Sequence, residues 1–199
     1  REQEKLTPEL EKKILAASTL VAVEDLYLPY RPKRKTRASI AKEKGLEPLA
    51  NLVLMQLTKT PLLKEAEHYI SEEKGVLTAE EALNGAKDIL AERIAETAEY
   101  RTYIRKATFQ EGSLDSSARD GNAESVYEMY YNFTEPVKKA AGHRILALNR
   151  GEKEKILTVK ITAPEEKILR YLEKKVITRE NPETARVLRE VTEDSYKRL

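Results

Sequence analysis

The chain of 199 residues contains no cysteine and only two histidines, His68 and His143, which lie far apart in the sequence. The absence of cysteine excludes disulfides, thiolate metal sites, iron–sulfur clusters and cysteine nucleophiles. Two histidines so far apart argue against an imidazole metal site and against histidine-based proton transfer. No run of about 18 uncharged apolar residues occurs, so we predict no membrane-spanning helix and expect a soluble, cytoplasmic protein.

Motifs that support catalysis are also missing. The sequence has no glycine-rich phosphate-binding loop, and Ser116-Ser117 lacks the context of a nucleophile elbow. Asp115, Asp120 and Glu124 resemble a carboxylate cluster for Mg²⁺, but their spacing lacks the ligand order of an EF-hand. A polar linker rich in Ser, Asp and Gly is the favoured interpretation of these residues. We therefore expect no enzymatic activity, metal, cofactor or small-molecule substrate, with a Mg²⁺-dependent nuclease as the alternative.

Charge, in contrast, is abundant and is segregated along the chain. The formal net charge is only +2, from 36 basic and 34 acidic residues. Residues 31–44 nevertheless hold seven basic residues and one acidic residue, whereas residues 65–99 hold ten acidic and three basic residues. This segregation allows one surface to attract a polyanion while another repels it.

Hydrophobic periodicity and capping signals predict a mainly α fold, a multi-helix assembly with one long central helix. Thr7 precedes a proline and an apolar stripe of helical spacing, which predicts a helix running to about Val23. Thr78 starts a longer apolar line that continues towards Phe109. We expect this second helix to be the central one.

The rest of the chain suggests two regions and one hairpin. The polar stretch ending at Gly75 breaks the periodicity, so we expect a helical lobe over 1–75, with a basic loop over 29–44, and a long-helix region over 76–199. Two β-branched apolar runs around a polar turn predict a β-hairpin near 145–161.

An aromatic cluster precedes that hairpin. Tyr127, Tyr130 and Tyr131 could form a platform on which bases stack. Their spacing with Val126 and Phe133 is helical, however, and favours packing in the core.

Several strings along the chain resemble one family, the bacterial Tex proteins, which are transcription accessory proteins. The strings lie in that family's order and approximate spacing, and they are LYLPYRPKRKTR (26–37), AKEKGLEPL (41–49), AKDILAE (86–92), HRILALNRGE (143–152) and DSYKRL (194–199). One departure is Ala141-Gly142, where the family often has Pro-Ser before the His-Arg pair.

The resemblance implies a multidomain nucleic-acid-binding protein. In that family a helical N-terminal region precedes an RNase H-like domain, helix-hairpin-helix motifs and a C-terminal OB-fold RNA-binding module. This chain then corresponds to a fragment of the helical N-terminal region, which agrees with Arg1 in place of an initiator methionine. The partners it implies are RNA or DNA, and the transcription machinery.

The clearest candidate site is the basic stretch that begins in a proline-rich loop. Pro29 and Pro32 disfavour helix at the residues before them, so the stretch starts on a loop. Exposed cations there can neutralise phosphates, while Tyr27 and Tyr30 can stack on bases. The candidate phosphate-binding residues are Arg31, Lys33, Arg34, Lys35, Arg37, Lys42 and Lys44.

The alternative for this stretch is a solvated loop whose arginines pair with the acidic helices. The family resemblance favours contacts with the phosphate backbone that do not read sequence. A different class of function is a protein-interaction scaffold that docks onto the transcription machinery or onto the protein's own C-terminal domains.

A second candidate patch surrounds the predicted hairpin. It comprises His143, Arg144, Arg150, Lys153 and Lys155. Glu152 and Glu154 offset its positive charge, so an ordinary charged surface is the favoured interpretation of this patch.

Overall fold

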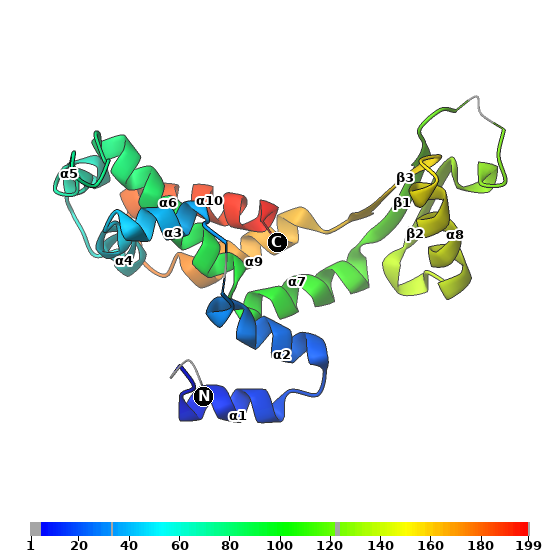
Figure 1. The fold of residues 1–199 in the computed structure, drawn as a ribbon, viewed down its shortest axis with the longest axis horizontal. Helices are drawn as coiled ribbons and strands as arrows, with labels where there is room; N and C mark the ends of the chain where they lie inside the picture. Colours follow the sequence, from blue (N-terminus) through cyan, green and yellow to red (C-terminus); the bar gives the residue numbers. More distant parts are fainter. Residues whose placement is uncertain (1–4, 33, 122–123, 199) are drawn as a thin grey trace. The chain divides into compact units, whose positions relative to one another are not determined.

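A computed structural model describes residues 5–32, 34–121 and 124–198 (Figure 1). These residues form ten α-helices, three 3-10 helices and three β-strands, so the predicted mainly α fold is confirmed. In chain order the elements are α1 (Pro8–Ala16), α2 (Leu20–Tyr27), η1 (Leu28–Tyr30), α3 (Arg37–Glu43), α4 (Glu47–Met55), α5 (Leu62–Glu67), α6 (Ala79–Ala95), α7 (Ala98–Glu111), β1 (Ser113–Ala118), η2 (Glu128–Tyr130), β2 (Asn132–Pro136), η3 (Val137–Lys139), α8 (Gly142–Lys153), β3 (Leu157–Thr162), α9 (Glu165–Val176) and α10 (Pro182–Lys197).

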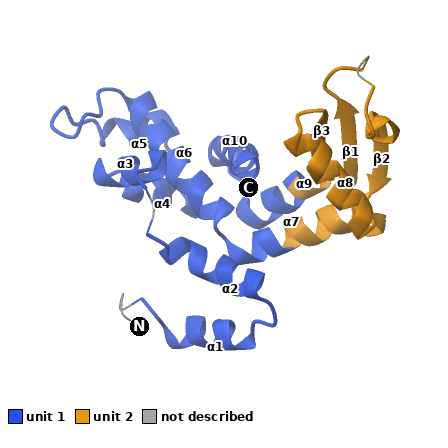
Figure 2. Cartoon of the chain, turned by 45° about the vertical axis from the view of Figure 1, so that its right-hand side comes forward, with its two compact units in different colours: residues 1–102, 169–199 blue, residues 103–168 orange. Residues whose placement is uncertain are grey.

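The chain folds into two compact units (Figure 2). Unit 1 comprises residues 1–102 and 169–199, and unit 2 comprises residues 103–168. Unit 2 is therefore an insertion in the chain of unit 1, and the divisions fall inside α7 and α9. Gly75, where the sequence suggested a boundary between lobes, lies within unit 1, because α5 and α6 on either side of it pack together.

Helix α6 is the centre of unit 1, and α3, α4, α5 and α10 all pack against it (Figure 1). Ala82 and Ala86 are fully buried, which lets neighbouring helices approach closely. The closest approach is at Gly85, where a Cβ would lie 2.4 Å from Cδ1 of the buried Leu46. A glycine that interrupts the apolar stripe is thus required by packing.

The predicted long helices are each divided in two, which corrects two expectations. The helix expected from Thr7 to about Val23 ends at Ala16, and Thr19 caps α2 by accepting a hydrogen bond from the Ala22 amide at 3.2 Å. The helix expected to run from Thr78 towards Phe109 ends at Ala95, and α7 begins at Ala98.

The second break has a local cause at Thr97. Its hydroxyl donates to the carbonyl of Arg93 at 2.9 Å, and its own carbonyl accepts the Arg101 amide of the next helix at 3.1 Å. Threonine therefore satisfies backbone groups at the end of α6 and at the start of α7. The apolar spacing does not reveal this break, because apolar residues continue at helical spacing in α7 after Thr97.

Unit 2 contains a three-stranded antiparallel sheet in the order β2-β1-β3, and the predicted hairpin near 145–161 is wrong. Residues 142–153 form α8, and within the predicted hairpin only Leu157–Thr162 is a strand. Gly151, expected in the turn, lies inside α8, where a Cβ would be 2.7 Å from Leu157 Cδ1. Close packing of helix on strand thus overrides the local turn signal.

The core of unit 2 contains the aromatic residues that the sequence placed there. Tyr127 and Tyr130 are buried together with Leu114, Leu148 and Leu157, which confirms that these two lie in the core, whereas Tyr131 is only partly buried against this cluster. Val126, in contrast, is 86% exposed, because this segment is a turn and a 3-10 helix and lacks the helical spacing assumed from the sequence.

Candidate nucleic-acid interface

The basic stretch lies in unit 1, between η1 and the C-terminal end of α3. Arg31, Pro32 and residues 34–36 are not helical, as the prolines predicted, and α3 begins at Arg37. The start of α3 is a capping box, in which Thr36 Oγ1 accepts the Ser39 amide at 3.0 Å and Ser39 Oγ accepts the Thr36 amide at 2.8 Å. The exit of the loop is therefore held in one conformation.

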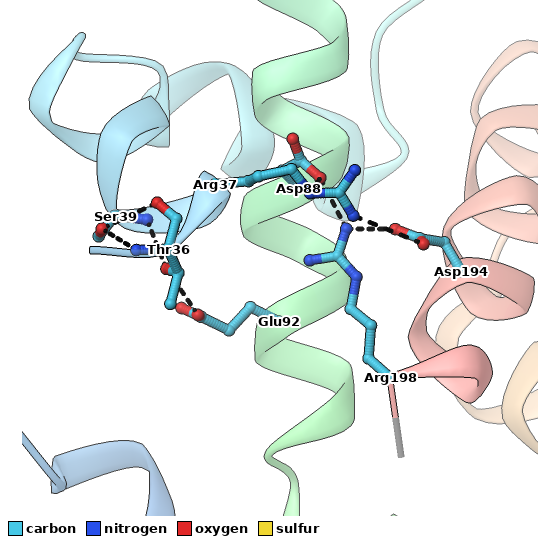
Figure 3. A network of polar contacts seen from close by, with 7 residues as sticks. All are labelled: Thr36, Arg37, Ser39, Asp88, Glu92, Asp194 and Arg198. Atoms are coloured by element: carbon cyan, nitrogen blue, oxygen red, sulfur yellow. Dashed lines mark hydrogen bonds and ion pairs between the residues drawn. The ribbon is translucent and has the colours of Figure 1, made fainter. Parts of the chain in front are cut away.

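The same threonine ties the loop to the central helix. Thr36 Oγ1 donates to Glu92 Oε1 at 3.0 Å, and Figure 3 shows Glu92 reaching from α6 towards the start of α3. Both Thr36 and Glu92 are partly buried, so the contact is shielded from competing water. The hydrogen bond from Thr36 to Glu92 thus anchors the C-terminal end of the loop to α6.

The candidate cations of this stretch fall into three groups. Arg31, Arg34 and Lys42 are exposed and form no ion pair within the part of the chain that the structure describes. Lys35 pairs with Glu43 at 3.1 Å, and Lys44 Nζ donates to the Gly75 carbonyl at 2.7 Å. Lys33 lies outside the described residues. Arg37 forms a third group by itself.

Arg37 belongs to a four-residue ion-pair network, shown in Figure 3. Its Nε lies 3.4 Å from Asp88 on α6, and its Nη2 lies 3.9 Å from Asp194 on α10. Arg198 donates to the same two carboxylates, with its Nη2 2.6 Å from Asp88 Oδ1. Two guanidiniums therefore share two carboxylates, and the formal charge of the network is zero.

Arg198 is the better-held partner in this network. Its side chain is 22% exposed, whereas that of Arg37 is 68% exposed. Burial acts to lower the pKa of the Arg198 guanidinium, but its hydrogen bonds to Asp194 and Asp88 outweigh burial and the pKa is raised. Arg37 is thus a loosely paired cation placed beside carboxylates that Arg198 already neutralises.

The second candidate patch lies in unit 2, on α8 and the turn that follows it. His143, Arg150 and Lys153 are exposed on α8, and Lys155 lies in the turn with a φ of 61°. Arg144 differs from them, because its guanidinium pairs with the buried carboxylate of Glu135 on β2. Four of the five patch residues thus lie on α8, and Arg144 is not one of its free cations.

The three carboxylates considered for Mg²⁺ do not form one site. Asp115 lies on β1 and accepts hydroxyl hydrogen bonds from Thr162 at 2.6 Å, Thr134 at 2.9 Å and Ser113 at 2.9 Å. The bonds from Thr162 and Thr134 are the main cause of its lowered pKa. Across residues 5–32, 34–121 and 124–198, no group of three His, Asp or Glu side chains could hold a metal ion.

Asp88, Glu92, Asp194 and Arg198 contact the basic stretch or its partners, although no local sequence signal marks them for this role. Asp88 and Glu92 fall in the string 86–92, and Asp194 and Arg198 fall in 194–199, both of which carry the family resemblance. The spacing of Asp194 and Arg198 is also that of an intrahelical ion pair. Arg37, however, contacts Asp88 and Asp194 from two other helices, and no local pattern predicts such tertiary contacts.

Comparisons with known proteins agree with the quoted strings. A family model described as "Tex central region-like" matches residues 58–195. The whole chain is 49% identical to the uncharacterized protein YdcI of Bacillus subtilis and spans 28% of its length. Over 80% of the chain there is 42% identity to Protein tex of Bordetella pertussis, of which 20% is covered.

A more distant similarity extends to animals. The whole chain is 29% identical to S1 RNA-binding domain-containing protein 1 of Pongo abelii and covers 21% of it. The chain thus spans between a fifth and just over a quarter of the length of these relatives. Among the described helices, none combines the length and apolarity needed to cross a bilayer.

Proposed function

The chain belongs to the Tex family, and from this premise we propose that it binds RNA or DNA through the phosphate backbone, without reading sequence, by means of the basic loop. Its relatives include a protein named as a transcriptional accessory protein and proteins named for an S1 RNA-binding domain. These names give the class of partner. The proposed contacts themselves come from residues of this chain.

The observation that carries the proposal is the set of unpaired cations Arg31, Arg34 and Lys42. All three are exposed and have no carboxylate partner among the described side chains. Phosphates can therefore bind them without first displacing an internal ion pair. Lys33 adds a fourth cation by its place in the sequence.

The loop is also restrained before any ligand binds. Pro29 lies in η1 and Pro32 lies in the loop, so the chain there has less conformational freedom to lose on binding than a Gly/Ser segment of equal length. The contacts of Thr36 with Ser39 and Glu92 hold the other end. Pre-ordering of this kind raises affinity without adding any contact.

We assign different roles to the paired cations. Arg37 is loosely paired with Asp88 and Asp194, so a phosphate that binds it must compete with those carboxylates. Lys35 and Lys44 bind within the protein and contribute to the positive potential around the loop. The role of the chain is therefore binding, and we propose no catalytic role for it.

Fluorescence anisotropy with a labelled single strand and a labelled duplex, at several salt concentrations, tests the proposal. If about four phosphates are neutralised, the slope of log K against log salt is roughly −3 to −4, with micromolar or weaker binding near physiological salt. Changing Arg31 and Arg34 together to Ala should make that slope shallower by about 1.4 to 1.8.

A matched control removes two exposed cations from elsewhere in unit 1. Lys59 and Arg179 form no ion pair in the described part of the chain, and Lys59→Ala with Arg179→Ala changes the net charge equally. This control should leave the slope close to that of the unmodified chain. Equal slopes for the loop variant and the unmodified chain, or no binding at low salt, would overturn the proposal.

A further inference from the structure

Helix α8 of unit 2 has one face that is packed and one that is not. Leu148 is 1% exposed, and Gly151 lies against Leu157 of β3 so closely that no Cβ fits. Arg144 extends to Glu135 on β2. The sheet therefore fixes α8 through its inner face and leaves the outer face without a partner in unit 2.

The outer face combines cations with one large apolar side chain. Leu146 is 67% exposed. His143 lies three residues before it and Arg150 four residues after it, with Lys153 a further three along, which places all of them on one helical face. None of the three basic residues has an ion-pair partner in the described part of unit 2. Leu146 thus lies beside the available cations Arg150 and Lys153.

The surrounding charge has the same sign. Residues 137–155 hold six Lys or Arg and two Glu, a net charge of +4. Glu154, the C-cap residue of α8, accepts a hydrogen bond from the Tyr127 hydroxyl at 3.0 Å. Glu152 follows Arg150 by two residues and therefore lies on the opposite side of α8. In the described part of the chain, neither carboxylate forms an ion pair with Arg150 or Lys153.

We propose that the outer face of α8 is a docking surface for an acidic protein segment that carries a large apolar side chain between its carboxylates. The carboxylates would pair with Arg150 and Lys153, while the apolar side chain would bury Leu146. A phosphate backbone complements the cations equally well but offers little apolar surface for Leu146. The leucine at the centre of the basic face therefore favours a protein partner over a nucleic acid.

Binding of two synthetic peptides to the 199-residue chain tests this. One peptide has leucines at i and i+4 flanked by glutamates, and the other is polyglutamate of equal length. The leucine peptide should bind more tightly. Leu146→Ala should weaken its binding about tenfold at every salt concentration, because the loss is apolar and not electrostatic.

The charged part of the surface has a separate signature. Arg150→Ala with Lys153→Ala should weaken both peptides and make their salt dependence shallower. Leu15→Ala is the control for the apolar change, since Leu15 is 81% exposed on α1 of unit 1, and it should leave peptide binding unchanged. Circular dichroism establishes that each variant keeps its fold.

Three outcomes would overturn the proposal. Neither peptide binds at low salt, or Leu146→Ala leaves the leucine peptide bound as before, or a single-stranded oligonucleotide loses more affinity than the peptide in the Arg150 and Lys153 variant. The last result would identify α8 as a nucleic-acid surface. This proposal does not depend on the function proposed for the basic loop, which is tested by the Arg31 and Arg34 variant and the oligonucleotide.

Discussion

Two stretches of this chain carry a strong positive charge, the loop before α3 in unit 1 and α8 in unit 2, and they hold their cations in different ways. In the loop, Arg37 and Lys35 are paired with carboxylates, while Arg31 and Arg34 are free of ion pairs in the described structure. On α8 the available cations stand on a regular helix around an exposed leucine.

This difference separates two kinds of polyanion surface. The loop is restrained by prolines and by a capping box, and it presents unpaired guanidinium groups near the exposed ring of Tyr27. This combination suits a nucleic-acid strand, which offers both phosphates and bases. A helical face that also presents Leu146 offers charge together with apolar area, which suits an acidic peptide. Equal charge therefore predicts different partners when the neighbouring side chains differ.

The largest effect is expected on the packed side of α8, where the comparison depends on a rigid helix. Leu148 is 1% exposed and lies in the core of unit 2 with Leu157 and Tyr127. Leu148→Ala removes buried methyl groups and leaves a cavity, so the free energy of unfolding should fall by about 3 kcal/mol. Urea unfolding followed by circular dichroism measures this loss.

Leu146→Ala is the matched control, because it makes the same chemical change two residues earlier on the exposed face. It should alter the free energy of unfolding by less than about 0.5 kcal/mol. Similar losses of unfolding free energy for the two variants would show that the inner face of α8 is not packed. In that case α8 would not be a rigid helical surface, and it would not differ from the loop in the way described.

An intermediate effect is expected at the network behind the loop. Arg198→Ala leaves Asp88 and Asp194 with Arg37 as their remaining partner in the network. Loss of hydrogen bonds between charged groups that are partly buried should lower the free energy of unfolding by about 2 kcal/mol.

Arg198→Lys provides the control for this change. It keeps the positive charge but not the planar group that reaches both carboxylates, so it should recover only part of the loss. The urea midpoint of all three proteins is the measurement. An unchanged midpoint for Arg198→Ala would mean that the network adds nothing to stability and that Arg37 is not positioned by it.

Local signals predicted the helical part of the fold well. Thr7 and Thr78 cap α1 and α6 as expected, because their hydroxyls accept amide hydrogen bonds from Leu10 and Glu81. The sheet was missed because its pairing is not local. Strand β1 is mostly polar, and its buried Ser116 is satisfied by donating to the Tyr130 carbonyl at 2.5 Å. Nothing in its own sequence indicates a central strand.

The candidate sites divide in the same way. The positions of Arg31 and Arg34 in an exposed loop followed from the neighbouring prolines, which act on the chain next to them. The pairing of Arg37 with Asp88 and of Arg144 with Glu135 depends on contacts between different elements. Sequence thus predicts where positive charge lies, and tertiary structure decides which of it is available.

The smallest effect is expected at Pro32, and it tests whether the loop differs from α8 by being pre-ordered without a helix. Pro32 is exposed and carries no charge. Pro32→Ala leaves every cation in place but gives the unbound loop more conformations. Such a change is typically worth about 0.4 to 1 kcal/mol, so affinity for a single strand should fall about two- to fivefold.

The salt dependence distinguishes this effect from a loss of contacts. Because the number of neutralised phosphates stays the same, the slope of log K against log salt should not change in Pro32→Ala. Pro61→Ala removes the same ring from an exposed turn before α5, outside the loop, and should leave affinity unchanged. A shallower slope in Pro32→Ala would mean that Pro32 orients the cations of the loop, so that fewer phosphates are neutralised without it. Unchanged affinity would mean that the loop gains nothing from restraint, and its proposed advantage over a flexible basic segment would disappear.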